Sequence, residues 1–352
     1  MSYKNAMDAI NLKMPKKIPR TEYSAQNHWA LVQKVTGITV NHESDKNIQI
    51  KASMAFEKAW DYGYCWSILT SRNTLGDFRT KMGHAEYASG GVDFSREVYC
   101  PFENVEQVLN FDPYKQYGEK NSERLVQEFN EHYKEVCRLH PDQVCTTGCY
   151  ITMISGFIEI FGWEMLLEAI GTDPKKFGNF ANRYADWILQ YFNAIAKCNA
   201  EVITVHDDIV WTSGPFADPK WYRKYIFPNY EKLFDPLLKA NKKIIFTSDG
   251  TYNEFIADIA SCGVNGFVME PTTDMEYVAK NYGKTHCFIG NADCRILTFG
   301  TKEDIKKEVT RCINIGKNYP GFFMAVGNHI PSNVPVKNAL YYNECYEEMA
   351  YR

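Results

Sequence analysis

The sequence predicts a (β/α)8 TIM barrel that carries an N-terminal helical extension. From Gln143 to the end of the 352-residue chain, short apolar runs alternate with helical segments. Strands that alternate with helices at this spacing indicate a parallel sheet. Five late strands, at 201–208, 242–250, 264–271, 285–293 and 321–329, join earlier ones near 65–69, 94–99 and 143–150. Eight parallel strands are the number that closes such a barrel.

The helical segments follow in order along the chain. Residues 1–60 are predicted as a mainly helical and polar extension packed on the barrel, with "NHWALVQKVTG" as its most amphipathic part. "ERLVQEFNEHYKEVCRL" repeats apolar residues at steps of three and four, which is typical of a helix. Further helices are expected over 153–198, 219–240, 251–263, 274–283, 301–316 and 335–352. Residues 61–352 therefore form the predicted catalytic barrel domain. A doubly wound open sheet is the alternative, although no glycine-rich nucleotide-binding motif supports it.

Composition excludes several classes of protein. The chain is 45% hydrophobic and 23% charged, with a formal net charge of −4, which is ordinary for a globular protein. This balance argues against a nucleic-acid partner, because such proteins usually present a basic face. No apolar run is long enough to span a membrane, and the first residues lack the apolar core of a signal peptide. We therefore expect a cytoplasmic protein whose eleven cysteines are reduced.

Polar side chains end each of the five late strands. In a closed barrel these ends meet at one mouth, where the active site of such folds lies. Several of the residues could instead cap helices, since Asp249 and Asp293 each precede one. The full set of strand ends reads His206-Asp207-Asp208, Thr247-Ser248-Asp249, Glu270, Asp293 and Asn328-His329.

Carboxylates beside imidazoles favour two kinds of chemistry. They can hold a cation such as zinc with one position open for substrate. They can also act as general acids or bases, because neighbouring negative charges raise the pKa of one carboxyl. Aromatic residues could line an apolar pocket beside them, although each is more often a core residue. These aromatic residues are Trp60, Tyr64, Trp66, Tyr87, Trp211, Phe216 and Tyr222.

The segment "MGHAEY" is a polar insertion between aromatic stretches. It is predicted either as a loop over the barrel mouth or as a solvated turn. In the first case His84, Glu86 and Tyr87 would bind substrate together with Trp211.

The C-terminal half resembles the uroporphyrinogen decarboxylase superfamily. "VHDDIVWTSGPFADPKWYRKYIFPNYEKLFD", "GTKEDIKKEVTRCINIG" and "GNHIPSNVPVKNA" carry the resemblance, which covers roughly residues 200–345. It implies a (β/α)8 barrel. The arginine-rich N-terminal motif of true decarboxylases is missing from the sequence. Thr247-Ser248-Asp249 and Asn328 replace the zinc ligands of the coenzyme M type of methyltransferase.

A third branch is more similar. "FVMEP", "GNADCRILTFGT", "PGFFMAVGNHIPSNVP" and "LYY" look like the ether-cleaving methyltransferases of anaerobic O-demethylase systems. The resemblance implies transfer of a methyl group from an aryl methyl ether to the cobalt(I) of a separate corrinoid protein, with release of a phenol. It also implies a zinc pattern, Glu-x14-Glu-x20-His, whose spacing Asp293, Glu308 and His329 reproduce with Asp in the first place.

Strand-end position and resemblance together assign the roles. Because Glu308 should lie on an outer helix, Glu270, Asp293 and His329 are the preferred zinc ligands, with Glu308 as the ligand that the pattern adds. His206, Asp207, Asp208 and Asp249 are the predicted catalytic residues, which orient the substrate or donate a proton. The expected partners are a corrinoid protein, which brings the corrinoid, and a small aromatic methyl ether. The superfamily also favours a homodimer.

Two alternatives remain open from the sequence. A decarboxylase acting on a tetrapyrrole or another carboxylate would need a cationic pocket and no corrinoid protein. A non-catalytic barrel that docks a corrinoid protein would bind its partner without methylating cobalt.

Overall fold

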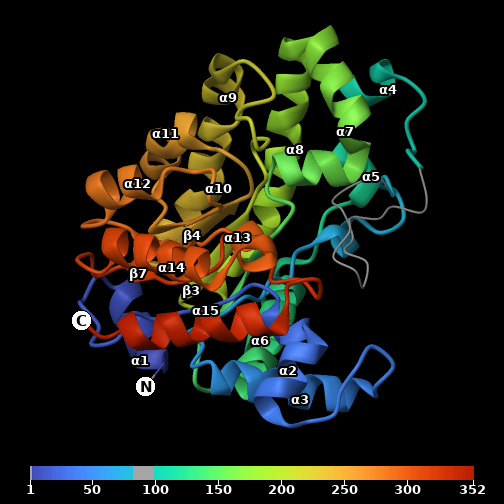
Figure 1. The fold of residues 1–352 in the computed structure, drawn as a ribbon. Coiled ribbons are helices and arrows are strands. Elements are labelled where there is room, and N and C mark those ends of the chain that lie inside the picture. Colours follow the sequence, from blue (N-terminus) through green and yellow to red (C-terminus); the bar gives the residue numbers. More distant parts are fainter. Residues whose placement is uncertain (1, 82–98) are drawn as a thin grey trace.

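The computed structural model describes residues 2–81 and 99–352, and it is built around one parallel sheet. In this described part of the chain, seven strands lie in the order in which they occur, and every neighbouring pair is parallel. The sheet curls on itself and is surrounded by helices (Figure 1). The strands are β1 (Tyr64–Cys65), β2 (Val144–Cys149), β3 (Val202–His206), β4 (Lys243–Ser248), β5 (Gly266–Met269), β6 (Cys287–Ile289) and β7 (Phe322–Phe323).

The segment around Arg20 closes the barrel between its first and last strands. Arg20 forms a parallel β-bridge to Tyr62 on one side and to Met324 on the other. The Gly63 amide donates to the Arg20 carbonyl at 2.9 Å, and the Met324 amide donates to the Pro19 carbonyl at 2.9 Å. The eighth position of the barrel is thus filled by residues that precede β1. The predicted barrel is confirmed, whereas the strand expected at 94–99 falls almost wholly outside the described residues.

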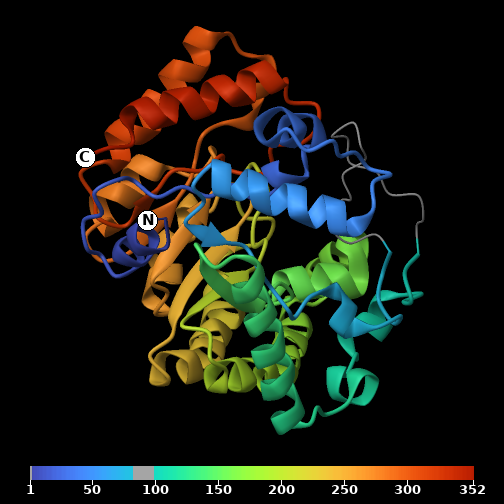
Figure 2. The same ribbon diagram turned by 90° about the horizontal axis from the view of Figure 1, so that it is seen from below.

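The N-terminal helices occupy two places. The helix α1 (Ser2–Ile10) packs Ala6, Ala9 and Ile10 into the interior of the barrel, among side chains such as Val202 and Phe323. The helices α2 (Trp29–Thr36) and α3 (Lys46–Ala59) lie on the outside, where α2 contacts the last helix of the chain. Both ends of the chain lie on the same side of the molecule (Figures 1 and 2).

Helices also follow the strands and cover the outside of the sheet (Figure 2). The predicted helical stretch 153–198 is interrupted at Gly162, whose backbone angles are not helical, and again at Asp173, which caps the helix that follows it. The stretch 219–240 is divided at Ile226, two residues before Pro228. These helices are α4 (Val105–Leu109), α5 (Pro113–Tyr117), α6 (Ser122–Leu139), α7 (Ile154–Thr172), α8 (Pro174–Lys197), α9 (Pro219–Tyr225), α10 (Phe227–Lys239), α11 (Ile256–Ser261), α12 (Met275–Tyr282), α13 (Cys294–Phe299), α14 (Lys302–Gly316) and α15 (Val336–Met349).

Among the described residues, two large apolar layers and a small third cluster of Cys65, Val136 and Cys145 hold this arrangement together. One fills the barrel, and a larger one lies between the sheet and the outer helices. All eleven cysteines lie in the described part of the chain, and each is a free thiol. In residues 2–81 and 99–352, no helix is both long enough and apolar enough to cross a membrane.

Candidate active site

An imidazole and two carboxylates meet where β3 and β4 end. His206 is the last residue of β3, Asp208 lies two residues further along the chain, and Asp249 comes directly after β4. His206 Nε2 lies 3.3 Å from Asp208 Oδ1, and the Asp249 amide donates to the same oxygen at 3.0 Å. One potential ligand atom from each of the three residues lies within 4.8 Å of the others, and this is the metal-capable group found among the described residues.

Asp207 points away from this group. Its carboxylate accepts hydrogen bonds from the backbone amides of Met153, Ile154 and Ser155, which begin α7, and from the Tyr230 hydroxyl. The N-terminal end of a helix favours such an anion, because its first backbone amides have no partner within the helix. Burial raises the pKa of Asp207 and the hydrogen bonds lower it; burial is the larger effect, so the pKa is raised to about 7. Asp207 is fully buried, and its hydrogen bonds attach the end of β3 to the start of α7.

His206 is fixed by stacking. The ring of Tyr150, which follows β2, lies parallel to the imidazole with the ring centroids 4.2 Å apart. Burial lowers the pKa of His206 to about 3. The imidazole is therefore neutral near pH 7, which is the form that binds metal ions.

Asp249, Glu270 and Asn328 form a second polar group beside the first. The side-chain amide nitrogen of Asn328, Nδ2, donates to Glu270 Oε1 at 2.6 Å and to Asp249 Oδ2 at 3.4 Å. The Gly250 amide donates to Glu270 Oε2 at 2.6 Å. Asp249 is open to solvent at the mouth, but protein atoms surround its carboxylate. This burial of the carboxylate is the largest cause that raises the pKa of Asp249 well above the ordinary value, and the negative charges of Asp208 and Glu270 raise it further. A cation at this position would relieve that repulsion.

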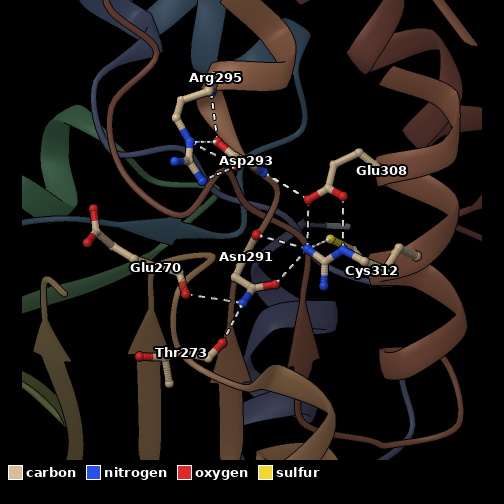
Figure 3. Close-up of polar contacts among 8 residues, drawn as sticks. Glu270, Thr273, Asn291, Asp293, Arg295, Glu308 and Cys312 are labelled. Atoms are coloured by element: carbon tan, nitrogen blue, oxygen red, sulfur yellow. Dashed lines mark hydrogen bonds and ion pairs between the residues drawn. The ribbon is translucent and has the colours of Figure 1, made fainter. Parts of the chain in front are cut away.

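Asp293 and Glu308 are held by arginines. Asp293 caps α13 and pairs with Arg295 at 2.7 Å, whereas Glu308 pairs with Arg311 at 2.7 Å. Burial would raise the pKa of Asp293, but the hydrogen bonds and charge of Arg295 lower it overall. Glu308 also accepts from the Asp293 amide at 2.9 Å, so the two acids belong to one structural network (Figure 3).

The predicted zinc ligands are not gathered into one site. The carboxylate of Glu270 points away from Asp293 and Glu308 (Figure 3). His329 lies at the mouth, where its Nδ1 is 2.7 Å from the Ser24 hydroxyl. Among the described residues, the geometry instead brings together His206, Asp208 and Asp249, which the sequence assigns to catalysis. The expected substrate contacts of His84, Glu86 and Tyr87 lie outside the described residues.

Three adjoining cavities lie at the mouth. An aromatic pocket of about 270 Å³ shares His206 and Thr247 with a smaller space of about 80 Å³. The smaller space shares Asp249 with an open cleft of about 660 Å³. The aromatic pocket is lined by Tyr23, Trp66, Ile68, Ser71, Tyr150, Thr204, His206 and Thr247. The open cleft is lined by Trp163, Asp208, Val210, Trp211, Thr212, Ser213, Asp249, Gly250 and Glu270.

The aromatic residues singled out in the sequence divide between core and mouth. Trp60, Tyr64 and Tyr222 are buried, whereas Trp66 lines the aromatic pocket and Trp211 lines the open cleft. Sequence reasoning missed five residues that line the pocket, and two of them, Tyr150 and Tyr23, are aromatic. Tyr150 is the last residue of the predicted strand 143–150, so the rule used for the late strands could have found it. Tyr23 follows the closing segment, which nothing in the sequence marks as a strand.

These features define a (β/α)8 barrel with a polar, aromatic-lined mouth at the carboxyl ends of its strands, the place where such folds carry their ligand sites. The profile of uroporphyrinogen decarboxylase (URO-D) matches residues 147–349, more than half of the chain. The chain therefore belongs to the uroporphyrinogen decarboxylase family.

Individual relatives are distant. The chain is 23% identical over 205 residues to uroporphyrinogen decarboxylase of Geobacter sulfurreducens, with 58% of each chain covered. It is 25% identical over 175 residues to that of Aliivibrio salmonicida, with 48% of this chain and 47% of that protein covered. The chain thus matches about half to three-fifths of the length of these relatives. A solved methyltransferase from Methanosarcina mazei superposes with a TM-score of 0.64 at 15% identity, over 99% of this chain and 98% of its own, which shows a shared fold.

Proposed function

We propose that this protein transfers a methyl group from an aryl methyl ether to the cobalt(I) of a separate corrinoid protein and releases a phenol. One observation carries the proposal: an aromatic pocket adjoins the group formed by His206, Asp208 and Asp249. A small aromatic ligand held there would place its substituent beside these polar side chains. The resemblance to the ether-cleaving branch supports this reaction, and the fold shared with a methyltransferase is consistent with transfer of a methyl group.

The pocket suits a substituted benzene ring. A cavity of about 150 Å³ lined by apolar side chains accepts benzene, so about 270 Å³ leaves room for substituents. The rings of Tyr23, Trp66 and Tyr150 line the space, and aromatic rings favour edge or offset contacts with one another. Tyr23 and Trp66 already pack edge to face, with centroids 5.5 Å apart. The ether would complete this aromatic cluster.

The reaction breaks the bond between the methyl carbon and the phenolic oxygen. The two electrons of cobalt(I) form the bond from cobalt to carbon, so cobalt becomes formally cobalt(III). The electron pair of the broken bond stays on the phenolic oxygen, which then takes up a proton. Phenolate is a poor leaving group, so a positive charge or a proton donor at that oxygen lowers the barrier.

The residues present fit a divalent cation such as zinc. The neutral imidazole of His206 and the carboxylates of Asp208 and Asp249 are ligand types that zinc accepts. When bound there, the cation would supply positive charge against the departing oxygen. Tyr150 holds the imidazole plane, and Asn328 holds the Asp249 and Glu270 carboxylates by hydrogen bonds. The aromatic walls orient the ring and keep water from the bond that breaks.

The first test is the visible spectrum of a cobalt(I) corrinoid protein mixed with this protein and a panel of methoxybenzenes. Formation of methylcobalt(III) with release of the matching phenol supports the proposal. A spectrum that stays at cobalt(I) with every ether, while the corrinoid protein accepts methyl iodide, contradicts it.

Family membership supports a second function, decarboxylation of a tetrapyrrole or another carboxylate. The measurement that separates the two is release of carbon dioxide from uroporphyrinogen without any corrinoid protein. Asp208, Asp249 and Glu270 at the mouth weigh against it, because they would repel a polycarboxylate.

A further inference from the structure

The two main cavities of the mouth differ in character. The aromatic pocket lies within the barrel, between the first strands and the closing segment at Tyr23. The open cleft lies outside it, between α7 and the loops that follow β3, β4 and β5. The smaller space joins them, because it shares His206 with the pocket and Asp249 with the cleft. Asp249 is the lining residue that the smaller space and the open cleft have in common.

We infer that the aromatic pocket holds the ether, whereas the open cleft receives the corrin ring that accepts the methyl group, with Trp211 as its main contact. This inference rests on the proposed function, which requires donor and acceptor to meet at one carbon atom. At about 660 Å³ the cleft is the larger space, and it is open to solvent, as a cofactor delivered by another protein requires.

Trp211 is exposed to solvent but held in position by its neighbours, as such a contact requires. Its side chain is 42% exposed, although it packs on Trp163 with centroids 5.6 Å apart and on Phe216 with centroids 5.8 Å apart. Its backbone amide donates to the Gly214 carbonyl at 2.9 Å, and its carbonyl accepts from Thr251 at 3.0 Å. An exposed tryptophan that its neighbours already hold in place loses little entropy on binding, and tryptophan is among the residues enriched at interface hot spots.

Gly250 fixes the distance between the Trp211 loop and β4. Its φ is +80°, and a Cβ at this position would lie 2.6 Å from the Trp211 carbonyl oxygen. Only glycine allows this close approach without displacing the loop. The close contact at Gly250 therefore fixes the position of the Trp211 loop relative to the neighbouring residue Asp249.

The polar side of the cleft complements a corrin. The rim of a corrin carries neutral amide side chains, whose N–H groups are hydrogen-bond donors. Asp208, Asp249 and Glu270 line the cleft and offer carboxylate acceptors, and a hydrogen bond to a charged group is stronger than one between neutral groups. The flat face of the ring would then pack on Trp211, as planar ligands do on exposed aromatic side chains.

The test uses two free cobalamins in place of the partner. Binding of hydroxocobalamin to the whole protein is measured by equilibrium dialysis, and cob(I)alamin serves as the methyl acceptor in the assay. We expect Trp211→Ala to weaken hydroxocobalamin binding and to raise the KM for cob(I)alamin, each by about tenfold or more. Trp211→Phe should recover part of both. Binding of 1,2-dimethoxybenzene, measured by calorimetry without cobalamin, should change by less than about twofold.

Tyr277→Ala is the matched control, because Tyr277 is 44% exposed but lies on the outer helix α12. It should leave both cobalamin measurements unchanged. Equal binding of hydroxocobalamin to wild type and Trp211→Ala overturns the inference, as does no binding to the wild type. Dialysis and calorimetry need no methyl transfer. Normal cobalamin binding with no methylation of cobalt would therefore contradict the proposed function and leave the assignment of the cleft standing.

Discussion

His206 Nε2 lies 3.3 Å from Asp208 Oδ1, at the end of the same strand and beneath the stacked ring of Tyr150. The backbone brings this pair together, because His206 closes β3 and Asp208 is held by a hydrogen bond from its amide to the Ser155 hydroxyl. With Asp249 from β4, the pair provides the three donor groups to which we assign the cation.

Replacing His206 should therefore remove the metal. We expect His206→Ala, purified in parallel with the wild type, to lower bound zinc by at least about tenfold, because one of three protein ligands is lost. Metal content by mass spectrometry is the measurement. His286→Ala is the control, since His286 lies at the opposite end of the sheet, just before β6 begins. Zinc that stays at the wild-type level in His206→Ala would contradict the assignment.

Glu308 should matter for stability and not for metal content. Its carboxylate is buried and bonded to Arg311 and to the Asp293 amide, so Glu308→Gln leaves Arg311 poorly compensated. We expect the free energy of unfolding in urea to fall by roughly 1–3 kcal/mol. Bound zinc should be unchanged. Loss of zinc together with an unchanged urea midpoint would restore Glu308 as a ligand.

The Arg20–Glu22 pair should be required for closure of the barrel. Both side chains are fully buried and lie 2.8 Å apart, and Glu22 also accepts from the Tyr342 hydroxyl and the Val326 amide. Arg20→Met leaves the Glu22 charge buried without its partner, which costs roughly 3–5 kcal/mol. The double variant Arg20→Met with Glu22→Gln should recover part of this loss in urea unfolding. A double variant that is less stable than Arg20→Met would contradict the pairing.

His140 should make stability depend on pH. Its Nδ1 lies 2.7 Å from the buried Glu57, and although burial lowers the pKa of His140, the hydrogen bond and charge of Glu57 raise it overall. The folded protein then binds the proton more tightly than the unfolded chain, whose histidine pKa is about 6.5. The stabilising contribution is complete below that pH and is lost as the pH rises through the higher pKa of the folded state.

The difference in unfolding free energy between wild type and His140→Asn measures this contribution, because the other histidines are common to both proteins. It should shrink as the pH is raised from about 6 to about 8. A difference that grows over that interval would show that Glu57 does not raise the pKa of His140.

The parallel order of the strands and the mouth at their carboxyl ends could be predicted from local patterns. The period of apolar residues depends only on near neighbours in the chain, so β2 to β5 begin and end within two residues of the predicted runs. The strand β6 begins two residues after the start of its predicted run and ends four residues before its end. The convergence of His206, Asp208, Asp249 and Glu270 also followed, because parallel strands direct all their carboxyl ends to one side.

The sequence by itself thus determined a (β/α)8 barrel with acids and histidines at one mouth. Only the tertiary structure decided which acids face the mouth. Asp207 and Asp208 are neighbours in the chain, but Asp207 turns to the amides of α7, whereas Asp208 turns to His206 and Asp249. Asp293 pairs with Arg295 and Glu308 pairs with Arg311, although the spacing of the two acids in the sequence resembles a metal-ligand pattern. Closure by the segment at Arg20, which also brings Tyr23 to the pocket, depends on contacts more than 300 residues away in the chain, such as that with Met324. Local sequence patterns carry no signal for such distant pairings, since these are decided by packing and charge compensation in the folded chain.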